Sequence, residues 1–189
     1  MTRKWPLVVT LLHLSCFTPA LGTAENMSFG VGATGNFFLI EGHPQLDPGI
    51  GGHVYFDYRF AQHLSAQFLF GVEMQDGSGP NAGDGDIIFF TMPSVLLKYY
   101  FLPSAGRIDP FAAIGIGLHL TSEGSRGDGT KAFGFGATAG LGLDCYFTPA
   151  LSAYAVGTFN SIGMIDSFGS NNGKGLFPVT ARGGLAFHF

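Results

Sequence analysis

The chain has few charged residues. Of its 189 residues only 12% are Asp, Glu, Lys or Arg, whereas 46% are hydrophobic, and an ordinary soluble domain carries about 25% charge. A formal net charge of −4 and a pI of about 5.8 argue against a nucleic-acid binder, which needs a basic surface. So much apolar and aromatic material also excludes a disordered chain. The composition indicates one domain whose apolar surface faces something other than water.

The first segment has the form of a secretion signal. Arg3 and Lys4 give it a positive start, and an apolar stretch runs from Trp5 to Phe17. Gly22-Thr23-Ala24 then shows the small-x-small pattern of a signal peptidase site. We expect residues 1–24 to be removed, with cleavage after Ala24 or else after Gly22, and residues 25–189 to form the folded domain. A retained anchor is the alternative, but the run is shorter than the roughly 20 residues of a spanning helix.

The segment after this leader lacks both a cysteine pair and a long apolar helix. It contains one cysteine, Cys145, so no disulfide can form within it despite the expected export. Its longest apolar runs, Pro110–Leu120 and Ala132–Leu143, contain two and four glycines, and glycine disfavours a helix. Loss of Arg3 and Lys4 changes the formal net charge from −4 to −6.

Instead, apolar residues alternate with polar or small ones along much of the chain, with a period of two residues. Along Leu64–Met74 every second residue is apolar, and the residues between them are mostly polar or small. Successive side chains of a strand point to opposite faces, so this pattern predicts a strand with one apolar face. In Ile87–Phe101, where the contrast is weaker, the pattern places Phe89 outside and Phe90 inside. The eight predicted strands are Met27–Leu39, Ile50–Phe60, Leu64–Met74, Ile87–Phe101, Pro110–Leu120, Phe133–Phe147, Leu151–Phe159 and Phe177–Phe189.

The lengths of strands and connections indicate a membrane barrel. Segments of about 9–15 residues suit tilted strands that cross a membrane, whereas soluble strands average about 5–6. Four connections are long and polar, namely Glu41–Gly49, Gln75–Asp86, Thr121–Ala132 and Asn160–Gly175. The others are shorter, and two of them carry the same pattern, F-x-x-x-L-S-A, which begins at Phe60 and at Phe147. Long loops at one end and short turns at the other are typical of a transmembrane β-barrel.

Residues 25–189 resemble the small eight-stranded outer-membrane barrels of Gram-negative bacteria, of the OmpA/OmpX type. The most specific element is the alternating last strand, which ends in Leu185, Phe187 and Phe189, and Met92–Phe101 and Asp109–Gly117 are similar to the fourth and fifth strands of such domains. The resemblance implies an all-β, antiparallel up-and-down barrel in the outer membrane. It also implies that the assembly machinery recognises the last strand. We expect no peptidoglycan-binding domain, in contrast to the two-domain OmpA pattern.

The face predicted to point inwards carries charges of both signs. An eight-stranded barrel is just wide enough for side chains to fill, and buried charges need partners. We therefore expect an ion-pair network that plugs the lumen, with Arg182 and His53 near mid-height. The expected members are Asp57, Arg59, Glu73, Lys98, Asp144 and Arg182, with Asp57, Lys98 and Asp144 in one layer. On the outer face, Phe60, Tyr99, Phe101, Phe147 and Phe189 are expected to form an aromatic girdle at the short-turn end.

Three functions remain open at this stage. The first is a monomeric outer-membrane protein with a structural or surface-interaction role, whose partners are membrane lipid, the assembly machinery and a surface ligand bound by the long loops. The second is a narrow, porin-like ion pore gated by the lumenal ion pairs. The third is a lipid A-modifying enzyme, for which the nearest residues are His119, Ser122 and Glu123, or His43 and Asp47. No known motif of such enzymes is present, so the sequence predicts no enzyme.

Other motifs are weaker. Asp84 and Asp86 offer too few oxygens for a calcium site, and Arg126-Gly127-Asp128 fits a solvated loop. The sequence predicts no cofactor and no metal. A secreted β-sandwich is a further alternative, but its strands would be shorter and its outer face more charged.

Overall fold

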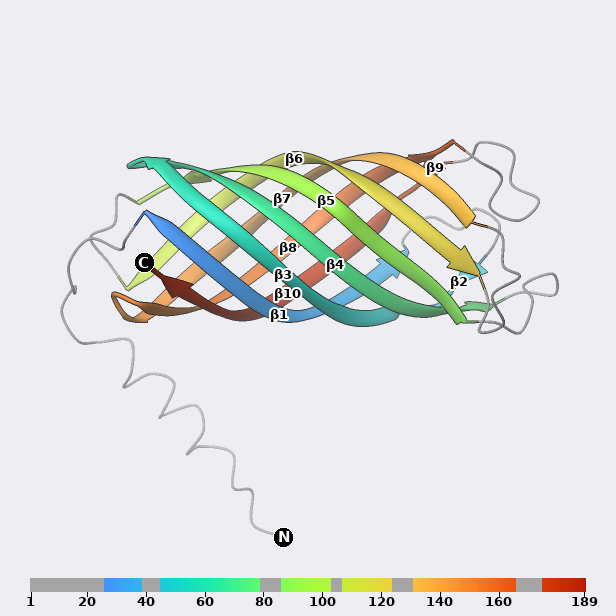
Figure 1. The fold of residues 1–189 in the computed structure, drawn as a ribbon, viewed down its shortest axis with the longest axis horizontal. Coiled ribbons are helices and arrows are strands. Elements are labelled where there is room, and N and C mark those ends of the chain that lie inside the picture. The colour runs from blue at the N-terminus through green and yellow to red at the C-terminus, as the bar shows by residue number, and fades with distance from the viewer. Residues whose placement is uncertain (1–25, 39–44, 79–85, 103–106, 124–130, 166–174) are drawn as a thin grey trace, which may run out of the picture.

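The computed structural model describes residues 26–38, 45–78, 86–102, 107–123, 131–165 and 175–189 (Figure 1). Eight long strands dominate it: β1 Met27–Phe38, β3 Gly49–Ala61, β4 Leu64–Ser78, β5 Asp86–Tyr100, β6 Ile108–Glu123, β7 Lys131–Thr148, β8 Leu151–Met164 and β10 Pro178–His188. Two short strands, β2 Gln45–Leu46 and β9 Gly175–Leu176, pair with β4 and β8. None of the described residues forms a helix that is long and apolar enough to cross a membrane. The expected leader, His43, Asp84 and Arg126-Gly127-Asp128 lie outside the described residues.

The sheet closes on itself. Each long strand is antiparallel to the next, and β10 pairs with both β8 and β1. The closing pair continues to the chain end, where the Met27 N–H donates to the Phe189 carbonyl at 3.2 Å and the Phe189 N–H donates back at 2.9 Å. An open edge would leave backbone groups unpaired, and closure removes it from the described strands. The predicted fold, an antiparallel up-and-down barrel of eight strands, is confirmed.

At the tight turns the strands end within two residues of the prediction, and several strands, though not β1 and β10, run further at the other end. β4 reaches Ser78 rather than Met74, and β8 reaches Met164 rather than Phe159. In these extensions the apolar alternation fades, whereas the backbone ladder continues because the neighbouring strand still supplies partners. The tight turns and the C-terminus lie at the left of Figure 1, and β2 and β9 lie at the opposite end.

One strand departs from the predicted alternation. In β5 the side chain of Phe89 is buried, so its predicted outward direction is wrong, and Phe90 is partly exposed rather than inside. The cause is a β-bulge. Met92 and Pro93 together oppose single residues of β4 and β6, and both are exposed. Proline has no N–H for the ladder, so it sits at a bulge, and the extra residue reverses the faces before it.

The repeated F-x-x-x-L-S-A pattern marks two equivalent turns. The register of the β3–β4 pair shifts between Arg59 and Ala61, and that of the β7–β8 pair shifts between Tyr146 and Thr148. In both cases the phenylalanine of the pattern is the extra residue. The serine of each copy, Ser65 or Ser152, is completely buried in the lumen. The repeat therefore encodes one local structure, a bulged strand end followed by a tight turn and an inward serine.

The outer surface of the barrel is apolar. Its most exposed large side chains include Ile50, Ile114, Leu141 and Met74. At the short-turn end the structure places all five residues of the expected girdle on the outside, and the rings of Tyr99 and Phe101 pack edge to face at 5.7 Å. Nearer the other end the exposed aromatics include Phe37, Phe135 and Phe159. Aliphatic residues between two aromatic belts are the usual arrangement on a membrane-spanning barrel.

Candidate functional site: the filled lumen

Aromatic rings fill the middle of the lumen, and glycines make room for them. Tyr55, Phe111 and Tyr154 are each paired across the sheet with a glycine, namely Gly30, Gly142 and Gly184. A Cβ at Gly30 would lie 2.1 Å from the Tyr55 ring, and one at Gly142 would lie 2.4 Å from the Phe111 ring. Leu69 and Leu96 pack against the same cluster. The high glycine content of the inner face therefore does not leave the barrel hollow.

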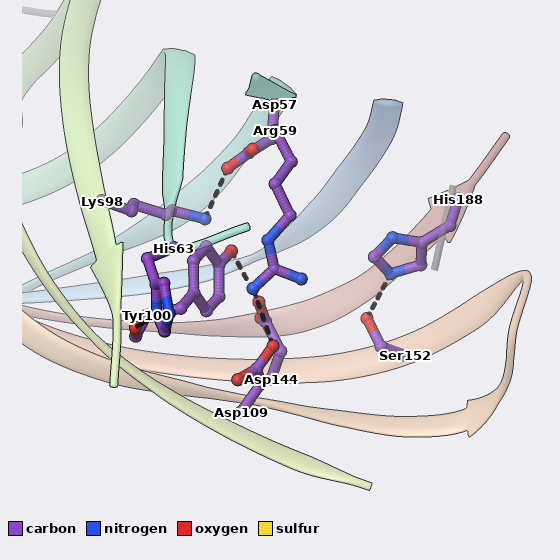
Figure 2. Close-up of polar contacts among 9 residues, drawn as sticks. All are labelled: Asp57, Arg59, His63, Lys98, Tyr100, Asp109, Asp144, Ser152 and His188. Atoms are coloured by element: carbon purple, nitrogen blue, oxygen red, sulfur yellow. Dashed lines mark hydrogen bonds and ion pairs between the residues drawn. The ribbon is translucent and has the colours of Figure 1, made fainter. Parts of the chain in front are cut away.

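A charged layer lies between these rings and the short-turn end (Figure 2). The Lys98 ammonium on β5 contacts the Asp57 carboxylate on β3 at 2.8 Å, and both side chains are buried. The Arg59 guanidinium donates to Asp109 on β6 at 2.8 Å, and its carbon lies 3.8 Å from the centre of the Tyr100 ring. These contacts link β3 to β5 and to β6 across the lumen.

The third carboxylate of the layer is Asp144 on β7. The Tyr100 hydroxyl donates to it at 3.0 Å, and Lys98 interacts with it electrostatically. The structure therefore brings Asp57, Lys98 and Asp144 into the one layer that their equal distance from the turns suggested. Sequence reasoning missed Asp109, because the expected strand began one residue later. Asp109 lies two residues before the inward Phe111 and therefore on the same face. A predicted strand that began one residue earlier would have included it among the lumenal charges.

Arg182 and Glu73 lie apart from this layer. The Arg182 guanidinium donates to the Thr158 hydroxyl at 3.4 Å, and it interacts electrostatically with Glu73 without forming an ion pair with it. His53 occupies the same level. One of its ring nitrogens is 2.8 Å from the Thr34 hydroxyl, and the other contacts the Tyr154 hydroxyl. The six predicted charged residues thus form two groups rather than one network.

Neutral residues close the lumen near the long-connection end. The Asn160 amide donates to Thr180 at 2.9 Å and accepts from Thr138 at 2.8 Å, so a polar chain joins β7, β8 and β10. Beyond it Phe89, Ile162 and Met164 form a second apolar cluster. Between the aromatic cluster and Arg182 lies a cavity of about 10 Å³, room for about one water molecule.

Among the residues considered for catalysis, those whose side chains the structure describes do not assemble into a site. His119 points into the lumen, 3.5 Å from the Thr91 hydroxyl, whereas Ser122 is three residues further along β6 and therefore on the opposite face. The side chain of Glu123 lies outside the described part, and Asp47 is exposed. Ser152 and His188 do form a hydrogen bond at 2.8 Å, but Ser152 is completely buried and unreachable for a substrate. Among the described residues no group of three His, Cys, Asp or Glu side chains could hold a metal ion.

Comparison with solved structures identifies the architecture. Neisserial surface protein A aligns with a TM-score of 0.67 at 15% identity, over 89% of this chain and all of that one. The chain has the fold of the small eight-stranded outer-membrane barrels. OprG of Pseudomonas aeruginosa aligns with a TM-score of 0.59 at 14% identity, over 89% of this chain and 98% of that one. Ail, the attachment invasion locus protein of Yersinia pestis, reaches 0.57 at 14% identity, over 87% of this chain and 99% of that one. No protein-family model and no curated protein matches the chain.

The last strand of this outer-membrane barrel fold has the expected outward residues. Leu185, Phe187 and Phe189 all lie on the outer surface, each about half exposed. Their backbone is held by both neighbours, because Phe187 pairs with Phe29 of β1 and with Leu151 of β8. In the closed barrel these side chains therefore form part of the apolar band.

Proposed function

We propose that the protein resides in the outer membrane of a Gram-negative bacterium as a monomeric, closed scaffold that presents its four long connections at the cell surface for interaction. The observation that carries this proposal is the inversion of the barrel relative to a water-soluble one. Large apolar side chains cover the outside, whereas Asp57, Lys98, Glu73 and Arg182 are buried inside. Such a surface suits lipid as its surroundings.

The filled lumen favours a scaffold over a pore. Two apolar clusters and the charged layer occupy it at successive levels, and the cavity beside Arg182 has room for about one water molecule. Hydrated ions need more space than this. The porin-like alternative would require the ion pairs Lys98–Asp57 and Arg59–Asp109 to separate together with the packed rings beside them.

The connections are the part of the chain through which we propose surface binding. β4, β6 and β7 contain 15, 16 and 18 residues, more than the about 9–11 that a membrane strand needs, and their extra length lies at the long-connection end. Ail has been solved with the heparin analogue sucrose octasulfate, so a barrel of this fold does bind an external ligand. For assembly, we propose that the machinery recognises the outward residues Leu185, Phe187 and Phe189 before the barrel closes.

The first experiment is fractionation followed by gel mobility of boiled and unboiled samples. We expect the protein in the outer-membrane fraction, and a mobility shift on heating, because a closed barrel resists detergent until it unfolds. In planar bilayers the purified protein should give no steady ion current. A soluble periplasmic protein without a shift would refute the membrane assignment, and a reproducible current altered by Lys98→Met would favour the pore.

A charge on the outer band should impair folding into a bilayer. Ile114 is 61% exposed in the apolar band, and arginine at the middle of a membrane costs about 2–4 kcal/mol. We expect Ile114→Arg to lower the free energy of unfolding by about that amount, measured by urea titration in lipid vesicles. Gln62→Arg, at the exposed tight turn after β3, is the matched control and should behave like the wild type. Equal stabilities of the two variants would contradict a lipid-facing band.

A further inference from the structure

Two buried acids of the charged layer face each other directly. Asp109 on β6 and Asp144 on β7 are cross-strand partners, and Asp109 acts on Asp144 electrostatically (Figure 2). They are only 1% and 4% exposed. Directly opposed residues of antiparallel strands have Cβ atoms about 4.5–5.5 Å apart, and like charges in these positions are destabilising. Two ionised carboxylates would therefore repel each other here, where little water can screen the charges.

The hydrogen bonds of the two acids leave one oxygen of each unused. Asp109 Oδ2 accepts from the Arg59 guanidinium at 2.8 Å, and Asp144 Oδ2 accepts from the Tyr100 hydroxyl at 3.0 Å. Both Oδ1 atoms are buried without a hydrogen-bond partner among the described residues. Two ionised carboxylates cannot satisfy each other, because both can only accept. A single proton between the two Oδ1 atoms would give each of them a partner.

The ion pairs of the layer leave Asp144 as the acid in excess. Lys98 contacts Asp57 and Arg59 contacts Asp109, each at 2.8 Å. Lys98 is also the cation that acts most strongly on Asp144, but its ammonium is already in contact with Asp57. A buried charge that lacks a partner is strongly destabilising. The geometry of the layer therefore favours a neutral Asp144.

The other titratable groups around Asp144 are phenols, one histidine and one arginine. The phenols that act on it electrostatically are Tyr55, Tyr100, Tyr146 and Tyr154. An ordinary tyrosine is uncharged at neutral pH, so these residues add no positive charge. On β10, His188 contacts the Ser152 hydroxyl at 2.8 Å. Arg107, which is partly exposed just before β6, accepts a hydrogen bond at its carbonyl from the Tyr146 N–H at 2.7 Å.

We propose that Asp109 and Asp144 share one proton at neutral pH, and that loss of this proton at higher pH loosens the short-turn end of the barrel. The proton resides on Asp144, which donates to Asp109, because Asp109 has the Arg59 guanidinium as its counter-charge. When the proton leaves, two adjacent anions repel each other across the β6–β7 pair. The layer is thus a pH-sensitive device in the wall of the closed barrel.

Infrared spectroscopy of the protein in lipid vesicles tests the proton directly. At neutral pH the wild type should show the carbonyl band of a protonated carboxylic acid, and Asp144→Asn should lose that band. Glu73→Gln changes a buried acid outside the charged layer and is the matched control, in which the band of Asp144 should remain. A wild type without the band, or a band that Asp144→Asn leaves unchanged, would overturn the proposal.

The pH dependence of unfolding is a second and independent test. An acid that keeps its proton in the folded state and loses it in the unfolded chain makes the protein less stable as the pH rises. From about pH 4, where an ordinary aspartate ionises, to neutral pH, the unfolding constant of the wild type relative to Asp144→Asn should rise about tenfold per pH unit, which corresponds to one proton.

The asparagine variant is suited to this comparison because it keeps the shape of the side chain. Its amide can accept from the Tyr100 hydroxyl and donate to Asp109, so it should fold. A ratio of unfolding constants that stays level with pH would show that Asp144 gains no proton on folding. A ratio that falls with pH would show that its ionised form is stabilised instead. Either result would refute the shared proton.

Discussion

Gly184→Ala is expected to weaken closure of the barrel by about 3 kcal/mol, the upper range for overpacking a well-packed interior. Gly184 lies on the inner face of β10 and pairs with Gly32 of β1. A Cβ built on it would lie 2.1 Å from the Val31 carbonyl oxygen and 2.6 Å from the Gly32 Cα. These are backbone atoms of the closing strand, so they cannot move aside as a side-chain end would. Urea titration in lipid vesicles would measure the loss, and heating gels would show a smaller folded fraction.

The neighbouring residue provides the control. Gly183 points outwards, and the nearest atom to its added Cβ, the Tyr154 carbonyl oxygen, is 3.4 Å away, which is an ordinary contact. Gly183→Ala makes the same chemical change one position earlier and should leave the unfolding free energy within about 0.5 kcal/mol of the wild type. If both variants lost stability equally, the cause would be a general effect of replacing glycine in this strand rather than the close approach of β10 and β1 at Gly184.

Lys98→Met should lower the unfolding free energy by about 3–5 kcal/mol, the usual result of removing one partner from a buried ion pair. The buried Asp57 carboxylate would lose the ammonium at 2.8 Å, and Asp144 would lose the cation that acts on it electrostatically. The methionine itself fits, since its end would lie where the Lys98 Nζ now lies, 4.7 Å from the centre of the Phe111 ring and 5.1 Å from that of Tyr55. The measurement is again urea titration in vesicles, at neutral pH.

The double variant Lys98→Met/Asp57→Asn distinguishes the loss of the ion pair from the loss of the packing that the Lys98 side chain provides. It removes the unpaired carboxylate, so most of the stability should return, because a buried pair contributes little net energy relative to neutral residues. Asp144 retains its hydrogen bond from Tyr100 in both variants. A double variant that remained as unstable as Lys98→Met would mean that the ammonium is needed for packing or for Asp144 rather than for Asp57.

The direction of side chains was largely predictable from the sequence, and strand pairing was not. Along β4 every second residue from Phe68 to Met74 is apolar and faces outwards, as the alternation predicted, because the two-residue period is a local property of the backbone. The prediction failed in β5, where Phe89 turned inwards. Met92-Pro93 was visible in the sequence, but whether a proline ends a strand or sits in a bulge depends on the strands beside it.

In the lumen, too, the direction of single side chains was predictable from the sequence, whereas their contacts were not. The sequence by itself determined that Asp57, Lys98, Asp144 and Arg182 would point inwards, and that Asp57, Lys98 and Asp144 would lie at one height. Only the tertiary structure decided that Arg59 contacts Asp109, 50 residues away, and that Arg182 and Glu73 stay apart. It also decided which glycine faces which ring, as in Gly30 with Tyr55. These contacts depend on the register between strands. The register is fixed by closure of the whole barrel, so it cannot be inferred from any single segment of the sequence.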